Sequence, residues 1–316
     1  MKKILKLDLI LFTIILMLFG ISSCKENIEK KSTKDEIALA AITTPPKKKK
    51  LTNEFKAYWY AGNAEITSYR LEMARYAETR KGTAVLIYVT EPFLADKQVK
   101  ADESNPSNIP VLKLNSTKKF LTGIYPYSIM TSSFYPVHDN QHAVKISTSV
   151  QEWCGHIYAQ LNNREEFNIT SHSYFENEAD QDFELEKTVL ENELWNKIRI
   201  DPSALPVGGF KAIPSFEYVR LGHKELKAYD VVATLNESDG LSSYELRYPE
   251  FDRTLTINFT STFPYTIESW TDTYKSGFGP NAKTMTTRAT KISSLKTPYW
   301  KQHNNEHLFL RDSLGL

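Results

Sequence analysis

The amino-acid sequence predicts a mainly β protein: an antiparallel curved sheet, or several, or a partly open barrel, with one main helix at about residues 188–199. Two observations predict this class. From residue 55 onward, apolar and polar residues alternate with the period of two that is typical of half-buried strands. Helices do not alternate regularly with strands along the chain, so a parallel sheet is not expected.

The first half of this region reads as strands joined by short turns. Apolar residues alternate with charged ones over residues 69–73, and a turn at Lys81–Gly82 precedes the apolar run at 84–89. Residues 65–90 are therefore predicted to form a hairpin. The same alternation at 144–150 predicts another strand.

One convincing helix interrupts the strands. Its apolar residues recur at helical spacing from Leu190 to Ile198, and Thr188 with Glu191 has the spacing of a capping box. Asp201–Pro202 is expected to end it, because the residue before a proline disfavours helical geometry.

The second half again alternates, over residues 244–248 and 254–259, with turn residues at 239–240 and 250–252. A Pro/Gly-rich joint at 201–209 separates a β-rich part with a terminal helix, residues 55–205, from a second β-rich part, residues 206–316. The two parts are either subdomains or one continuous domain.

The N-terminus reads as a lipoprotein signal peptide, residues 1–23. Three lysines precede a short apolar run at 9–19, and Ile21-Ser22-Ser23-Cys24 resembles the bacterial lipobox. We therefore expect Cys24 to carry palmitate-type acyl chains that hold the protein to a membrane. Residues 24–54 then form the lipidated cysteine and a flexible tether. Lys25-Glu26 lacks the aspartate that retains enterobacterial lipoproteins on the inner membrane, which favours the outer membrane of the cell envelope.

Cysteine usage and charge narrow the function classes. If Cys24 is lipidated, Cys154 has no partner for a disulfide, and the domain relies on its core. Removing the signal takes away three lysines and one aspartate and leaves a net charge of −1, which does not favour nucleic acid as a partner.

Cys154 and His156 are the candidate catalytic residues. On a strand, residues two apart share a face, so a thiolate–imidazolium pair is conceivable. Burial of Cys154 as a small apolar residue is the alternative. Together with His172 and the nearby acidic residues, these side chains define a hypothetical hydrolase.

Metal-binding candidates are weaker. The alternating carboxylates Glu176, Glu178, Asp180 and Asp182, continued by Glu184 and Glu186, would share one face of an extended segment and could attract calcium. A solvated face is the alternative, and Leu185 stands where an EF-hand loop needs glycine. His138 with His142 could form a metal-binding pair, and residues 303–307 match the His-x-x-Glu-His zinc motif, but both patterns are short enough to occur by chance. No metal or other cofactor is expected.

Several stretches resemble a family of exported lipoproteins from flavobacteria and their relatives; they are residues 58–69, 97–100, 149–162 and 171–175. Members are often labelled septum formation inhibitor Maf. That label implies a nucleotide pyrophosphatase with a Ser-Pro-Arg-Arg motif, which this sequence does not contain. At the level of fold, the pattern is similar to periplasmic lipoprotein-carrier sheets, which curve around a helix and shelter an apolar ligand.

Two function classes follow. The first is a non-enzymatic envelope lipoprotein that carries, binds or assembles with an apolar ligand, a glycan or a protein. Aromatic residues make up 12% of the chain, and Tyr58, Trp59 and Trp153 are the candidate ligand-binding residues. The second is an envelope hydrolase that uses the Cys154, His156 and carboxylate set.

Overall fold

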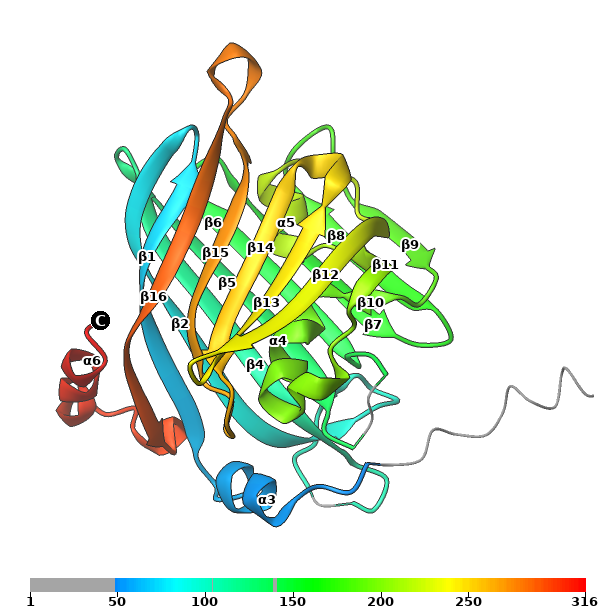
Figure 1. Cartoon of the computed structure of the whole chain (residues 1–316), viewed down its shortest axis with the longest axis vertical. Helices are drawn as coiled ribbons and strands as arrows, with labels where there is room; N and C mark the ends of the chain where they lie inside the picture. Colours follow the sequence, from blue (N-terminus) through cyan, green and yellow to red (C-terminus); the bar gives the residue numbers. More distant parts are fainter. Residues whose placement is uncertain (1–48, 104, 139–140) are drawn as a thin grey trace, which may run out of the picture. The chain divides into compact units, whose positions relative to one another are not determined.

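One large, mainly antiparallel sheet dominates the structure, a computed structural model that describes residues 49–103, 105–138 and 141–316 (Figure 1). The sheet has 16 strands. They are β1 (Ala64–Arg75), β2 (Glu78–Leu94), β3 (Val99–Lys100), β4 (Ile109–Thr122), β5 (Tyr125–Pro136), β6 (Lys145–Glu152), β7 (Gly155–Asn163), β8 (Phe167–Ser173), β9 (Gln181–Leu185), β10 (Val189–Leu190), β11 (Gly208–Ile213), β12 (Tyr229–Ser238), β13 (Leu241–Tyr248), β14 (Arg253–Thr260), β15 (Ile267–Ser276) and β16 (Lys283–Thr297).

Strand neighbours in the sheet are mostly neighbours in sequence. The order runs β10-β11-β12-β13-β14-β15-β16-β1-β2-β4-β5-β6-β7-β8-β9, with β3 paired to β2. The pairing of β16 with β1 joins the two halves of the chain at the middle of the sheet, and β9 and β10 are its two open edges. The prediction of a mainly β, antiparallel fold is confirmed, and one sheet runs through both predicted parts.

Four α-helices lie in the described part of the chain: α3 (Asn53–Trp59), α4 (Glu191–Ile200), α5 (Phe216–Leu221) and α6 (Phe309–Ser313). Helix α4 lies on the concave face of the sheet, which curves around it in Figure 1. Its contacts come from both halves of the sheet, because Leu194 and Ile198 share a buried cluster with residues of β2 and of β14.

The predicted helix at 188–199 exists, but it begins three residues later, at Glu191. The predicted capping box was wrong in its residues: Thr188 donates its hydroxyl to the carbonyl of Lys211, across the short parallel pair β10–β11. The side chain of Glu193 accepts the N–H of Leu190 instead (3.4 Å). Because the Thr188 hydroxyl is bonded to Lys211, it does not cap the helix, and the helix begins at Glu191.

Two other local predictions change. The hairpin β1–β2 turns at Tyr76 and Ala77, which both have positive φ, and not at Lys81–Gly82. Gly82 lies inside β2, where a Cβ atom would meet the carbonyl oxygen of Lys119 on β4 at 2.2 Å. The folded region also begins earlier than residue 55, because Leu51 is buried and Lys49 pairs with Asp201.

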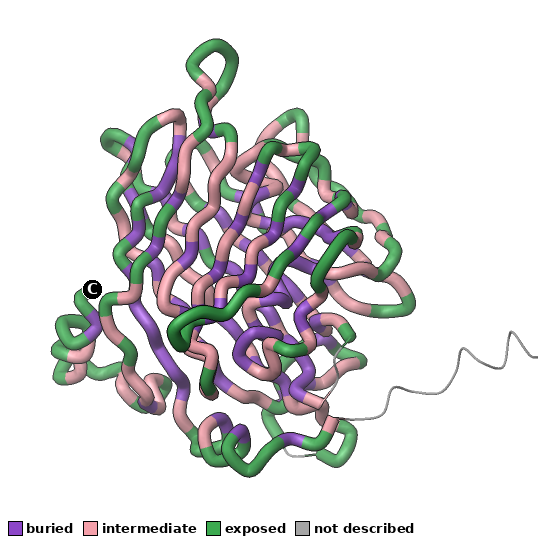
Figure 2. The backbone as a smooth tube through the Cα atoms, viewed as in Figure 1, coloured by how far each residue is buried: buried purple, intermediate pink, exposed green. Residues whose placement is uncertain are grey.

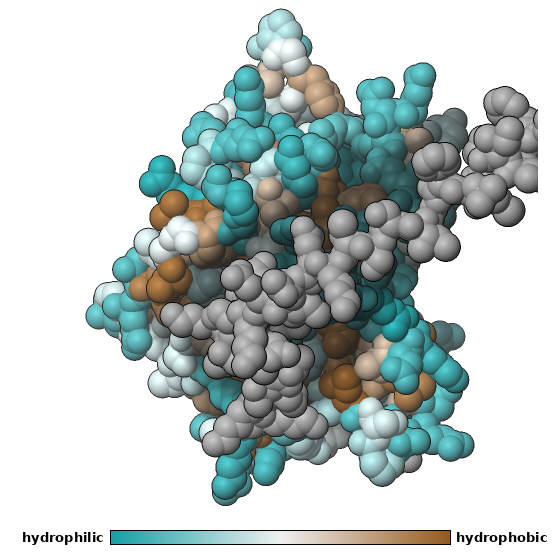
Figure 3. Space-filling model, turned by 90° about the vertical axis from the view of Figure 1, so that its right-hand side faces the viewer, coloured by the Kyte–Doolittle hydropathy of each residue, from teal (hydrophilic) through white to brown (hydrophobic). Residues whose placement is uncertain are grey.

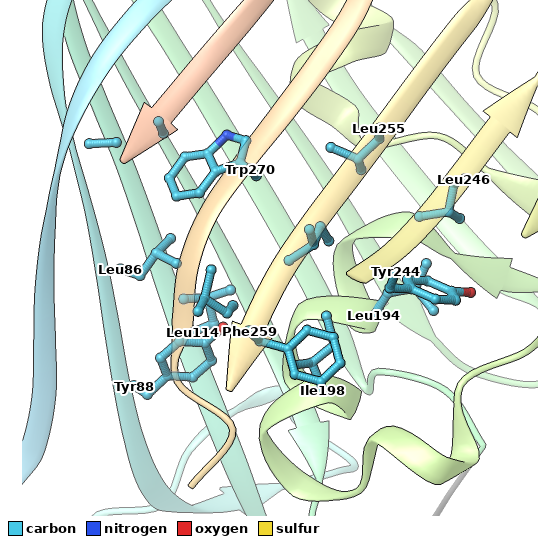
Figure 4. Close-up of a cluster of buried hydrophobic side chains, with 14 of the residues drawn as sticks. Leu86, Tyr88, Leu114, Leu194, Ile198, Tyr244, Leu246, Leu255, Phe259 and Trp270 are labelled. Carbon is cyan, nitrogen blue, oxygen red and sulfur yellow. The ribbon is translucent and has the colours of Figure 1, made fainter. Parts of the chain in front are cut away.

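The core lies between the concave face of the sheet and α4. Figure 2 shows buried residues along most strands. Among the residues that Figure 3 leaves visible, hydrophilic ones predominate and hydrophobic ones show in several separate patches. In Figure 4, Leu194 and Ile198 of α4 lie among side chains from strands of both halves, such as Tyr88 of β2 and Phe259 of β14. Each large buried apolar side chain contributes about 1.5–3 kcal/mol, so this cluster fixes the curvature of the sheet around α4.

The sheet has two distinct ends. The turns β1–β2, β4–β5, β6–β7 and β15–β16 lie at the upper end in Figure 1, together with α5. Helix α3 lies at the lower end, next to the first described residues. No helix in the described ranges is long and apolar enough to cross a membrane. Cys24 lies outside the described residues.

Candidate functional site

Helix α5 covers part of the upper end of the concave face. Ser215 caps it by accepting the N–H of Tyr218 (3.3 Å). Three polar contacts tie it to surrounding strands and turns. Glu217 accepts two hydrogen bonds from Lys118 of β4 (2.8 and 2.9 Å), Arg75 of β1 donates to the carbonyl of Leu221 (2.7 Å), and Arg220 pairs with Glu178 (2.9 Å).

Below α5 lies a small inner cavity of about 70 Å³, lined by α4, α5 and the strands. Its floor is an ion-pair network around Arg253, which is 2% exposed. The guanidinium donates to both oxygens of Glu191 (2.6 and 2.8 Å) and to both oxygens of Asp272 (2.8 and 2.9 Å). The ring of Tyr218 lies over it, with the guanidinium carbon 3.9 Å from the ring centroid. A floor this polar does not suit an apolar ligand.

The pKa values of the two carboxyl groups of this floor are shifted in opposite directions. Burial raises the pKa of Asp272, and Arg253 only partly offsets this. Burial also acts to raise the pKa of Glu191, but the charge and hydrogen bonds of Arg253 outweigh it and hold that pKa below its usual range. Glu191 is therefore the ionised partner of Arg253, and Asp272 is the carboxyl that protonates more readily.

Aromatic rings and an unused hydroxyl complete the inner cavity. Trp195 of α4 and Trp270 of β15 meet edge to face, with ring centroids 5.3 Å apart. Ser133 is 1% exposed, and its hydroxyl has no hydrogen-bond partner among the residues that the structure describes. A cavity of about 70 Å³ holds roughly two water molecules, so the inner cavity alone takes no larger ligand.

A second, upper cavity of about 350 Å³ lies on the outer side of α5. It shares Tyr218, Leu221, Gly222 and Tyr274 with the inner cavity, so the two adjoin. Its lining includes three basic side chains, three aromatic rings and, among the described residues, no carboxylate. The basic residues are Arg75, Lys224 and Lys275, and the aromatic ones are Tyr218, Tyr274 and Phe278. Its volume lies within the range of small-molecule sites, roughly 300–1,000 Å³.

Arg75 is the most informative of these residues. It is 7% exposed and has no ion pair with any described carboxylate. It donates to Leu221 O, Tyr76 Oη (3.1 Å) and Tyr127 Oη (3.2 Å), while its buried Nε has no partner in the described chain. Burial acts to lower the pKa of Arg75, but the two tyrosines outweigh it, so the group stays charged. A buried cation without a counter-ion is costly, and a bound anion would supply one.

A third cavity, of about 560 Å³, lies between α5 and strands β7 to β9. Its lining carries both signs of charge, and its central groups are already paired: Glu178 with Arg220 and with His223 (both 2.9 Å). Hydrogen bonds from His223 and Ser173, with the charge of Arg220, outweigh burial and lower the pKa of Glu178. These pairs connect α5 to the β8–β9 turn. The third cavity therefore has fewer unpaired charged side chains in its lining than the upper cavity has.

The predicted catalytic pair is exposed. Trp153 and Cys154 form the turn between β6 and β7, and His156 is the second residue of β7, so Cys154 and His156 do not lie on one strand. A hydrogen bond and the nearby charge of Glu152 raise the pKa of the Cys154 thiol, which disfavours the thiolate. His172 is also exposed and contacts Asp180 (3.3 Å). None of the three cavities above is lined by Cys154 or His156.

The acidic run does not form a single carboxylate face. Residues 174–180 are a turn between β8 and β9, and only 181–185 form a strand. Glu178 pairs with α5, Glu184 accepts from Asn168 (2.6 Å), and Asp182 and Glu176 are exposed. His138 and His142 contact different groups, Lys49 O and Glu193. Within the described ranges, no group of three or more His, Cys, Asp and Glu side chains is arranged to hold a metal ion.

Two of the predicted ligand-binding residues, Tyr58 and Trp59, lie at the lower end. Trp59 is 1% exposed, and its ring lies 5.0 Å from the Arg199 guanidinium carbon. Tyr58 donates its hydroxyl to Glu65. Both side chains thus pack around the buried Arg199–Glu65 pair. Trp153, the third candidate, is 68% exposed, and its ring centroid is 6.3 Å from that of Tyr125.

Sequence reasoning missed the residues of the cavities. Arg75 and Asp272 sit in strands whose alternation does not distinguish them from solvent-facing charges. Glu191 was assigned only a capping role. One pattern in the sequence could have indicated that Arg75 faces inward. Arg75 follows Tyr69, Leu71 and Met73 at the same period of two, so all four residues lie on one face of the strand.

No protein-family model, no curated protein and no solved structure matches this chain.

Proposed function

We propose that this protein is a membrane-anchored envelope lipoprotein that binds, without catalysis, an acidic glycan fragment in the upper cavity. The observation that carries the proposal is Arg75, a buried cation without a carboxylate partner in the described chain, which lines a cavity of about 350 Å³. Lys224 and Lys275 add two exposed cations, neither of which pairs with a described acidic residue. An anionic ligand would find three donors there.

The aromatic rings favour a sugar among anionic ligands. Tyr218, Tyr274 and Phe278 supply ring faces, and sugars commonly stack their C–H faces on such rings. The hydroxyls of a sugar can also use the polar groups at the junction with the inner cavity. The filled core around α4 leaves apolar cargo less room on the concave face. An acidic oligosaccharide fits this combination of charges and rings.

Calorimetric titration of the full, membrane-extracted chain tests this. We expect trigalacturonic acid to bind and maltotriose, which is uncharged, to bind at least tenfold more weakly. The double variant Lys224→Gln/Lys275→Gln should weaken binding of the acid roughly tenfold, since each exposed charge contributes up to about 1 kcal/mol. Lys301→Gln, an exposed and unpaired lysine outside the cavity lining, is the matched control and should change nothing.

Equal binding of both trisaccharides would contradict the proposal, as would unchanged affinity in the double variant. Release of shorter products from trigalacturonic acid, seen by mass spectrometry, would instead assign the site to a hydrolase.

The anchoring part of the proposal has its own test. We expect Cys24→Ser to move the protein from the membrane fraction to the soluble envelope fraction, because the acyl chains supply most of the membrane affinity. Mass spectrometry of the purified protein should show an N-terminal acylated cysteine at position 24. Full retention of the variant on the membrane would mean that another part of the chain holds it there.

A further inference from the structure

The outer, convex face of the sheet carries a groove that the glycan proposal does not use. It has a volume of about 380 Å³ and lies between the C-terminal segment, residues 299–316, and outward-facing residues of β1, β2, β4 and β16. Glu65 and Tyr69 point inward from β1, so the alternation of the strand turns Ile66 outward.

Strand register places an apolar floor at one end of this groove. Ile66 lies opposite Ile87 on one side and Leu295 on the other. Ile66 forms a small buried cluster with Ala64, Val89 and Leu314, separate from the core around α4, and the partly buried Ile87 and Leu295 pack against it. Leu314 belongs to the C-terminal segment, and Ser68 donates its hydroxyl to the Leu314 carbonyl. This segment therefore covers the apolar end.

The chemistry changes along the strands in regular steps. Two residues further along, Ser68 lies opposite Val85, and Val85 opposite Thr117. After another two residues Thr83 lies between Arg70 and Lys119. Each such step is roughly 6.6 Å along the strand. The apolar residues, the hydroxyl groups and the two cations therefore follow one another within roughly 13 Å.

Three cations, Lys119, Arg70 and Arg311, lie in or next to this groove. In the part of the chain that the structure describes, no ion pair involves Lys119, Arg70 or Arg311, the last of which also lines the groove. The groove is also lined by His303 and His307, and the buried Nδ1 of His307 has no hydrogen-bond partner among the described residues.

From this gradient we infer a binding site for a long-chain fatty acid. Its acyl chain lies over Ile66, Ile87 and Leu295 beneath the C-terminal segment, and its carboxylate meets Lys119 and the hydroxyls of Thr83 and Thr117. The groove volume is in the range of small-molecule sites. The site is independent of Arg75 and the upper cavity, so either proposal can fail alone.

Displacement of the fluorescent probe dansyl-undecanoic acid by palmitate, measured on the full chain carrying Cys24→Ser, tests the inference. We expect Lys119→Gln to weaken palmitate binding roughly fivefold and to leave hexadecanol binding within twofold, because only the acid has a charged head. Val85→Trp, which fills the groove from an outward position, should abolish both. Lys283→Gln, an exposed lysine at the start of β16, is the matched control.

Three results would overturn the inference: no displacement by palmitate, equal loss of acid and alcohol in Lys119→Gln, or full binding in Val85→Trp. The same displacement assay on the lipidated protein distinguishes a free fatty acid from the protein's own acyl chain. If the probe binds Cys24→Ser but not the lipidated protein, the occupant is the protein's own acyl chain and not a free fatty acid. The double variant Lys224→Gln/Lys275→Gln should bind palmitate normally whichever way the glycan test turns out.

Discussion

Replacing Arg253 with alanine is expected to destabilise the protein by about 3–5 kcal/mol, because it leaves the buried Glu191 and the mostly buried Asp272 without their cation. Arg253 makes four hydrogen bonds, two to Glu191 and two to Asp272, and its guanidinium packs on Tyr218. No other ion pair of Glu191 or Asp272 is present in the described chain to take over. Urea unfolding of the full chain at neutral pH measures the effect as a lower midpoint.

The exposed pair Lys211–Asp230 provides the control for this prediction. Its side chains are 64% and 82% exposed, so Lys211→Ala should change the stability by less than about 1 kcal/mol. The cost of Arg253→Ala should also shrink at lower pH. Without the guanidinium, burial raises the pKa values of both carboxyls in the folded state, and protonation then relieves the penalty. A loss as small as that of Lys211→Ala would show that the network contributes little.

The positions of several strands could be predicted from the sequence, but the strands with which they pair could not. Alternation identified β6, β13 and β14 closely, since each buries one face and the period of two is then visible. The capping-box spacing failed at Thr188 and the turn signal failed at Lys81–Gly82, because contacts with another strand decided the geometry there. Long-range pairing of this kind is not encoded in local spacing.

The candidate sites were less accessible to prediction than the fold. Cys154 and His156 stood out as reactive residue types, yet Cys154 lies in an exposed turn and His156 is exposed at the start of β7. Arg75 and Lys119 did not stand out, because a charged residue within an alternating strand usually faces solvent. Their significance comes from lacking a counter-ion in the described structure. This depends on the segments that the fold brings beside them: Arg75 donates to Leu221, and Lys119 lines a groove with residues of the C-terminal segment. Only the assembled sheet reveals it.

At the lower end, Glu65→Gln is expected to destabilise the protein by about 3 kcal/mol at neutral pH. Arg199 is 1% exposed and donates to both oxygens of Glu65 (2.6 and 2.7 Å). Burial acts to raise the pKa of Glu65, but the charge and hydrogen bonds of Arg199 outweigh it, so this pKa lies below its ordinary value of 4.5. The stability contributed by Glu65 is therefore fully present above about pH 4.5 and is lost as the pH falls through the folded-state pKa.

Because the pKa of Glu65 is lowered in the folded state, the effect of Glu65→Gln should depend on pH in one direction only. The stability difference between the wild type and Glu65→Gln should be constant above about pH 5 and should narrow as the pH falls below 4.5. Glu268→Gln removes a pair whose side chains are 33% and 27% exposed, and it should cost less than about 1 kcal/mol. A difference that stays constant down to pH 3 would mean that Glu65 contributes through packing and not through its charge.

The effect should also spread to α3, where the chain enters the sheet. Tyr58 donates to Glu65, Trp59 packs on Arg199, and Lys296 Nζ lies 3.3 Å from the centroid of the Tyr58 ring. Glu65→Gln leaves one neutral amide oxygen in place of the two charged oxygens that accept from Arg199 and Tyr58. The hydrogen bond that holds Tyr58 therefore weakens, and α3 should open more often. We therefore expect amide hydrogens of residues 53–59 to exchange faster in Glu65→Gln, with those of β13 and β14 changed only by the global loss of stability.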